Sequence, residues 1–118
     1  MITIILPIPP SLHQLYGVKK GGGKYLTSAY RAWRREADWR IAEQRAQKSA
    51  IVGPYTFQLT LPMHCRLDPD NALKAPMDLL VRWNITADDR HCKSATAVKS
   101  RDLTGNDCVV TIAEWGTA

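Results

Sequence analysis

The chain has 118 residues and a net charge of +5, enough for one domain with little room for a second. Hydrophobic residues make up 45% and charged residues 23%, which excludes a disordered chain, and the longest apolar run is far too short to span a membrane. Residues 1–59 hold nine lysines and arginines against three acids, whereas residues 60–118 hold seven against eight. This asymmetry favours a polyanionic partner, nucleic acid before an acidic membrane surface, although a solvated basic surface gives the same count.

The first half of the chain predicts a strand, a basic loop and a long helix. Residues 2–8 are rich in β-branched side chains and predict a strand that prolines end. Residues 11–26 predict a loop that forms a flexible basic arm, because three glycines lie among lysines. Residues 28–49 lack glycine and proline and predict a helix capped by Thr27 or Ser28. Its predicted core stripe consists of Tyr30, Trp33, Ala37 and Ile41.

The second half predicts a strand, a short helix and a closing hairpin. Residues 55–61 alternate and predict a strand that continues towards Cys65. Residues 72–83 predict a helix that begins close to Pro76. Residues 93–100 and 107–115 predict two strands joined by a hairpin turn. We therefore expect one α+β domain over residues 1–118, with two helices and a mixed sheet in the order β-α-β-α-β-β, in which the crossovers are parallel and the hairpin is antiparallel.

The most informative stretch is Asp68-Pro69-Asp70-Asn71. A residue before proline is pushed into an extended conformation, and residues i and i+2 of an extended chain point the same way. Asp68 and Asp70 are therefore expected to aim two carboxylates at one spot, where hard oxygen ligands suit Mg²⁺ or Mn²⁺. A turn or helix-capping role for Asp70 and Asn71 is the alternative.

Further charged residues follow this acidic pair. Lys74 lies four residues beyond Asp70 and can stabilise a leaving oxygen, and Asp78 can hold it by an i,i+4 ion pair. Asp88 and Asp89 follow the second predicted helix; one of the two can join the first pair, and periodicity does not say which. An exposed surface pair and an exposed turn are the alternatives.

The three cysteines, Cys65, Cys92 and Cys108, are an odd number at wide spacing. They favour a reducing cytoplasm over a disulfide framework, and the chain starts without the pattern of a signal peptide. Cys65 and Cys92 each follow a histidine, which raises a zinc site as an alternative. Neighbours on a strand point to opposite faces, so packing cysteines are favoured.

Over nearly its full length the chain resembles the RusA family of Holliday junction resolvases, which are small homodimeric endodeoxyribonucleases of bacteria and prophages. The motifs that carry the resemblance are Leu6-Pro7-Ile8-Pro9-Pro10-Ser11, the basic loop, Asp68-Pro69-Asp70-Asn71 with Lys74 and Asp78-Leu79-Leu80, Asp88-Asp89, and Glu114-Trp115-Gly116. The combined spacing is much more specific than any single motif.

The resemblance implies that Asp68, Asp70 and Asp89 bind Mg²⁺, with Mn²⁺ as a possible substitute, and that Lys74 is the catalytic lysine. The choice of Asp89 over Asp88 rests on the resemblance alone. It also implies a homodimer that cuts four-way DNA junctions by paired nicks, in the cytoplasm of a bacterial or prophage-encoding host and without a membrane partner. We expect the positive charge to bind DNA phosphates through Lys19, Lys20, Lys24, Arg31, Arg34, Arg35 and Arg66.

Two departures from the family pattern stand out. A dense arginine run before the first aspartate is reduced here to Arg66, and Asn84 occupies a position where glycine is common. Two other functions stay open on the sequence: a structure-specific nuclease for other branched DNA, and a DNA-binding module without catalysis. The acidic residues with Lys74 argue against the second, because a pure binder gains nothing from carboxylates near phosphates.

Overall fold

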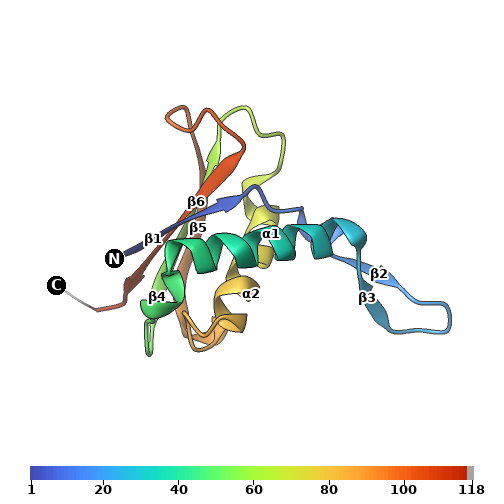
Figure 1. Ribbon diagram of the computed structural model, residues 1–118, viewed down its shortest axis with the longest axis horizontal. Helices are drawn as coiled ribbons and strands as arrows, with labels where there is room; N and C mark the ends of the chain where they lie inside the picture. The colour runs from blue at the N-terminus through green and yellow to red at the C-terminus, as the bar shows by residue number, and fades with distance from the viewer. Residues whose placement is uncertain (117–118) are drawn as a thin grey trace.

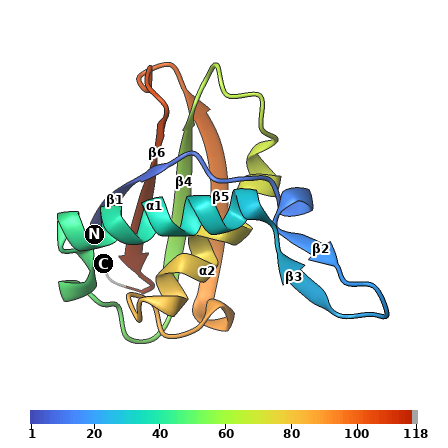
Figure 2. The ribbon, with the colours of Figure 1, turned by 45° about the vertical axis from the view of Figure 1, so that its right-hand side comes forward.

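The computed structural model describes residues 1–116, in which a four-stranded sheet carries both helices on one of its faces (Figures 1 and 2). The main elements, in chain order, are β1 (Ile2–Pro7), α1 (Ser28–Gln44), β4 (Tyr55–Pro62), α2 (Lys74–Arg82), β5 (Cys92–Ser100) and β6 (Asp107–Glu114). Four short 3₁₀ helices join them: η1 (Leu12–Gln14), η2 (Ala46–Lys48), η3 (Pro69–Ala72) and η4 (Asp89–His91). The predicted α+β class, with two helices and a mixed sheet, is confirmed.

The strand order of the main sheet is β1-β6-β4-β5. β4 and β5 are parallel, as the crossover through α2 predicts, and β6 runs antiparallel to both of its neighbours. The parallel pair expected from the crossover through α1 is wrong, because β6 lies between β1 and β4. The predicted pairing of the last two strands as a hairpin is wrong, because β4 lies between β5 and β6. Residues 101–106 are enough chain to step over one strand, since neighbouring strands lie about 4.8 Å apart.

The core lies between the sheet and the helices. The predicted stripe of α1 is confirmed, because Tyr30, Trp33, Ala37 and Ile41 are its buried residues. Thr27 is the observed cap, and its hydroxyl accepts the Tyr30 N–H at 3.2 Å. The helix ends at Gln44, short of the predicted residue 49, because Arg45 adopts a left-handed conformation with φ of 56°.

The predicted basic loop contains a small antiparallel hairpin, so its description as a loop alone is wrong. β2 (Tyr16–Val18) pairs with β3 (Lys24–Leu26), and the hairpin projects from the body of the protein (Figures 1 and 2). Gly21, Gly22 and Gly23 make its turn possible, because φ is +88°, +107° and +85° at these positions. The hairpin is therefore an arm that carries Lys19, Lys20 and Lys24.

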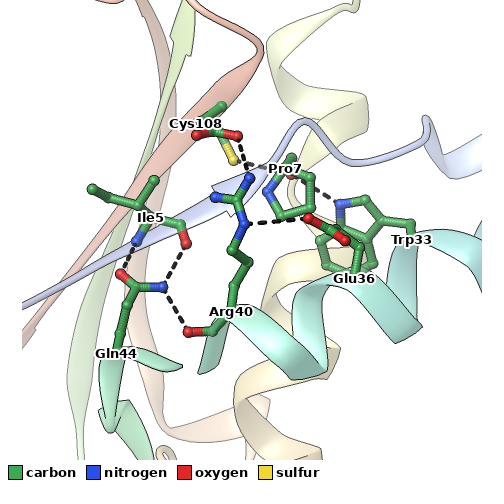
Figure 3. Close-up of polar contacts among 8 residues, drawn as sticks. Ile5, Pro7, Trp33, Glu36, Arg40, Gln44 and Cys108 are labelled. Atoms are coloured by element: carbon green, nitrogen blue, oxygen red, sulfur yellow. Dashed lines mark hydrogen bonds and ion pairs between the residues drawn. The ribbon is translucent and has the colours of Figure 1, made fainter. Parts of the chain in front are cut away.

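Polar contacts hold α1 against β1 (Figure 3). The Gln44 side chain makes two hydrogen bonds to one residue of the strand: Oε1 accepts the Ile5 N–H at 2.8 Å, and Nε2 donates to the Ile5 carbonyl at 2.7 Å. Trp33 Nε1 donates to the Pro7 carbonyl at 2.9 Å. Arg40 bridges Glu36 at 3.3 Å and Asp107 of β6 at 3.0 Å. These contacts fix the helix along the strand.

A second set of contacts joins α1 to α2 through Asp38. Its carboxylate accepts hydrogen bonds from Trp83 Nε1 at 2.8 Å and Arg82 Nη1 at 3.2 Å, and Arg82 Nη2 lies 2.8 Å from Asp38 Oδ1. Partial burial raises the pKa of Asp38, but the bonds from Arg82 and Trp83 outweigh it and hold the pKa below 3.8. Asp38 therefore stabilises the position of α2.

We expect Asp38→Asn to lower the free energy of unfolding by about 1–2 kcal/mol, because charge-assisted hydrogen bonds are weakened at a partly exposed site. A carboxyl with a lowered folded pKa stabilises the protein above its unfolded pKa, and this contribution disappears as the pH falls through the folded value. The difference from wild type, measured by urea unfolding, should therefore shrink between pH 7 and about pH 3. Glu43→Gln, at an exposed position of the same helix, is the control; an equal loss there would contradict the role of Asp38.

Candidate functional site

The acidic motif lies at the entry to η3. Asp68 has φ of −65° and ψ of 126°, extended as expected before Pro69. The extended chain stops there, because Pro69 begins the 3₁₀ helix that contains Asp70, and the Asp68 carbonyl accepts the Asn71 N–H at 3.1 Å. The prediction that Asp68 and Asp70 share one extended segment is therefore wrong: proline at a first helical position starts a turn. Both aspartates are exposed.

Lys74 is the first residue of α2, and its Nζ lies 3.2 Å from Asp78 Oδ1. The expected i,i+4 ion pair is confirmed. The hydrogen bond with Asp78 raises the pKa of Lys74, and the charges of Asp78 and Asp89 act in the same direction against partial burial. Lys74 is therefore a cation over the whole physiological range, half-exposed at the start of a helix.

Asp88 and Asp89, between which periodicity does not choose, have different surroundings in the structure. Asp88 caps η4: Oδ1 accepts the Arg90 N–H at 3.2 Å, and Oδ2 lies 3.2 Å from Arg90 Nε. The pKa of Asp88 is lowered, first by the Arg90 N–H and then by a hydrogen bond with the Asp89 side chain. Asp89 is exposed, and its charge acts on Lys74. Of the two, Asp89 is the one whose charge acts on Lys74 at the start of α2.

The elements that bear these residues meet at one end of α2. η3 directly precedes α2 and packs against β5, and η4 packs against α2. Asp70 on η3, Lys74 on α2 and Asp89 on η4 therefore border a common region.

Within residues 1–116, no three Asp, Glu, His or Cys side chains are arranged as a metal site. The chemistry of the donors nevertheless suits one ion. Mg²⁺ keeps several waters and is usually held by one or two carboxylates and substrate phosphates, rather than by an all-protein cage. Exposed carboxylates such as Asp70 and Asp89 leave room for both. The residues present therefore fit a hydrated Mg²⁺.

An aromatic pair that the sequence analysis did not assign to the site joins it to the hairpin. The rings of Tyr16 on β2 and Tyr30 on α1 meet edge to face, with centroids 5.9 Å apart. Lys24 Nζ lies 5.8 Å from the centre of the Tyr16 ring, and Tyr16 in turn acts on the pKa of Lys74. Burial and the charge of Asp78 raise the pKa of Tyr30. No sequence motif identifies these tyrosines as neighbours of the site, because Tyr16 comes near Lys74 only in the folded protein.

The basic residues of the first half are mostly exposed. Arg31, Arg35 and Arg66 are exposed, as are the hairpin lysines, while Arg34 is half-buried with its guanidinium 5.6 Å from the Tyr30 ring centre. A shallow surface hollow beside Arg35 is also lined by Trp39, whose side chain is 62% exposed. The hairpin leads directly into α1 (Figure 2), so its lysines and the α1 arginines lie on adjoining elements, and together they are called the basic region.

The cysteines and histidines do not form a zinc site among the described residues. Cys108 is buried and its Sγ donates to the Pro7 carbonyl at 3.5 Å, and burial raises its pKa to about 12. This thiol packs in the core, as expected. No helix within residues 1–116 has the length and apolar character needed to cross a membrane.

A small α+β scaffold with a basic arm, exposed carboxylates and a lysine has the side chains that a protein acting on nucleic-acid phosphates needs. Comparison with known families narrows this class: the model of the family described as endodeoxyribonuclease RusA matches residues 7–113, most of the chain. The chain belongs to the RusA family of endodeoxyribonucleases, which act on branched DNA junctions. None of the curated proteins matches the chain.

Proposed function

We propose that this protein resolves four-way DNA junctions by Mg²⁺-dependent hydrolysis of two phosphodiester bonds, in recombination and repair. Membership of the RusA family supports the reaction class. The observation that carries the assignment to this chain is the grouping of Lys74, its partner Asp78 and the nearby Asp89 beside a basic hairpin.

The residues have separate roles in this proposal. Asp68, Asp70 and Asp89 are the carboxylates that would hold Mg²⁺ or Mn²⁺, and Asp88 caps η4. When bound, the ion supplies an activated water and neutralises charge on the scissile phosphate. Lys74 donates hydrogen bonds to the non-bridging or leaving oxygen as its negative charge develops. Asp78 holds the Lys74 ammonium in place and keeps it protonated.

The basic region holds the arms of the junction through phosphates. Each cation that binds a phosphate releases a condensed counterion, which gives affinity without reading the base sequence. The proposed contacts are Lys19, Lys20 and Lys24 on the hairpin, Arg31, Arg34 and Arg35 on α1, and Arg66 before η3.

Two opposed cuts need two active sites, and one chain supplies one acidic group of residues. We therefore propose a two-fold symmetric homodimer, because a second identical site then lies across the two-fold axis of the junction. The proposed location is the cytoplasm of a bacterial or prophage-carrying cell.

The test is cleavage of a synthetic immobile four-way junction, compared with flap DNA and linear duplex, with Mg²⁺ and with EDTA. We expect paired nicks in the junction with Mg²⁺ alone, and little cutting of the other two substrates. Faster cutting of the flap would favour a nuclease for other branched DNA. Junction binding without any cutting would favour the non-catalytic module.

A further inference from the structure

The outer side of α1 carries a large aromatic side chain that neither the core nor the proposed active site uses. Trp39 is 62% exposed, whereas Trp33, on the buried stripe of the same helix, is 6% exposed. Trp33 donates a hydrogen bond to the Pro7 carbonyl, but within residues 1–116 the Trp39 indole makes no hydrogen bond and no ring contact. A single exposed apolar residue is ordinary on a protein surface, so the surroundings of Trp39 decide whether it has a role.

The first feature of these surroundings is a pair of arginines that lack an acidic partner. Arg31, Arg35 and Trp39 are four residues apart, so they follow one another along the same side of α1. Both arginines are exposed, and within residues 1–116 neither makes an ion pair or a side-chain hydrogen bond. Their guanidinium groups are therefore available to an anion from outside the protein.

The acids of α1 do not neutralise this charge. Glu36 pairs with Arg40 at 3.3 Å, and Asp38 is held by Arg82 at 2.8 Å and by the Trp83 indole. Glu43 lies one turn beyond Trp39, on the side away from the two arginines. The uncompensated positive charge thus lies on the N-terminal side of the Trp39 indole, towards the hairpin.

A hollow lies between the indole and this charge. Its lining residues are Ala32, Arg35, Glu36 and Trp39, and its volume is about 490 Å³. Side chains of a helix lean towards its N-terminus, so the indole is expected to lie over the turn that contains Arg35, and the small side chain of Ala32 leaves space beside it. The volume is within the roughly 300–1,000 Å³ of small-ligand sites. A shallow hollow with an aromatic wall and a cation suits a flat group that is joined to an anion.

We propose that Trp39 and Arg35 form a binding site for single-stranded DNA, in which an unpaired base stacks on the indole and its phosphate binds the guanidinium. The inference deepens the proposed DNA binding by the basic region and rests on it. Bases inside a duplex have both faces covered by their neighbours, whereas an unpaired base offers a face to an aromatic side chain of the protein. An apolar protein partner would also cover Trp39, but it would leave the charges of Arg31 and Arg35 without a partner.

The position of Trp39 suits a strand that is already bound by the basic region. α1 follows directly on the hairpin and lies at the outside of the molecule (Figures 1 and 2). Arg31 and Trp39 are eight residues apart, about 12 Å along the helix axis, which a few nucleotides can span. Base pairs beside a branch point lack a stacked neighbour on one side, so they cost less to open than pairs within a duplex. We therefore expect Trp39 to favour branched DNA with unpaired bases over fully paired DNA.

The experiment compares a short oligothymidylate, whose bases do not pair with each other, with a duplex of the same length. Fluorescence anisotropy without Mg²⁺ measures both affinities. Trp39→Ala should weaken binding of the oligothymidylate about 10-fold or more and change duplex binding less than about twofold, because it removes a stacked base. The matched control is Trp115→Ala, at a tryptophan that is 56% exposed but lies outside α1 and the hairpin. This variant should bind both DNAs as wild type does.

Further variants separate stacking from apolar contact. Trp39→Phe keeps an aromatic face and should keep most of the affinity for the oligothymidylate, whereas Trp39→Leu should lose about as much as Trp39→Ala. Arg35→Gln should reduce the magnitude of the salt slope for the oligothymidylate by about 0.7, the value for one phosphate of a single strand. Circular dichroism checks that each variant is folded.

Three results would overturn the proposal. One is a folded Trp39→Ala protein that binds the oligothymidylate as tightly as wild type. The second is an equal loss for the duplex, and the third is a Trp39→Leu protein that binds as well as Trp39→Phe; either would exclude stacking on an unpaired base. None of these measurements involves cleavage, so a wild-type protein that binds the oligothymidylate but does not cut junctions contradicts the proposed function and not this inference.

Discussion

Asp70→Asn is expected to slow junction cleavage at least about 100-fold while leaving junction binding within about twofold of wild type. The reason is that Asp70 is proposed to hold the ion and not to contact the DNA. Asparagine keeps the shape of the side chain, so η3 is expected to persist. Single-turnover cleavage with Mg²⁺ gives the rate, and gel-shift binding without Mg²⁺ gives the affinity.

Asp102→Asn is the matched control for this experiment. Asp102 is exposed in the segment between β5 and β6, where its backbone N–H donates to Ser100 Oγ at 3.1 Å. Its replacement removes the same charge away from α2 and should leave the rate unchanged. An Asp70→Asn protein that cuts at the wild-type rate would exclude Asp70 from the metal site.

The second large effect that we expect is on the salt dependence of DNA binding, through the lysines of the hairpin. If about six phosphates are neutralised, the logarithm of the binding constant falls with the logarithm of salt concentration with a slope near −5. Replacing Lys19, Lys20 and Lys24 together by glutamine should reduce the magnitude of this slope by about 3, because three counterions are no longer released. Affinity for the junction should fall most at low salt. Fluorescence anisotropy across a salt series measures both.

A double variant, Lys48→Gln with Arg101→Gln, shows the effect of removing two of the positive charges outside the hairpin. Both side chains are exposed and lie outside the hairpin and the α1 arginines. It should keep the slope within about one of wild type. A triple hairpin variant with an unchanged slope would show that the hairpin does not touch phosphate.

The sequence was sufficient to predict the features that depend on helical geometry alone. The buried stripe of α1 and the pair of Lys74 with Asp78 follow from side chains that meet three or four residues apart on any helix. The end of α1 did not follow, because nothing in the local pattern requires Arg45 to adopt a left-handed conformation. The prediction of the strand order failed for a similar reason. Two strands joined by a turn predict a hairpin, but the insertion of β4 between β5 and β6 depends on contacts across the whole sheet.

For the acidic residues, too, the sequence predicted some features and not others. The extended state of Asp68 follows from Pro69, a local steric effect. The same proline starts η3, so the orientation of Asp70 could not be predicted by continuing the extended chain. The capping of η4 by Asp88 depends on Arg90, whose N–H and side chain engage Asp88. The approach of Tyr16 to Lys74 depends on how the hairpin packs, and the loop pattern of residues 11–26 holds no sign of it.

The bonds from Gln44 to Ile5 also affect how the protein behaves when it is concentrated. A strand with free N–H and carbonyl groups invites the strand of another molecule, and a sheet that is free on both sides can grow into a filament. Here Gln44 and Trp33 engage the outer groups of β1 at Ile5 and Pro7 (Figure 3). Strand addition is then left to the β5 side, where two molecules joined through β5 would leave no open side for a third. Gln44 and Trp33 therefore hinder the addition of a strand at the β1 side of the sheet.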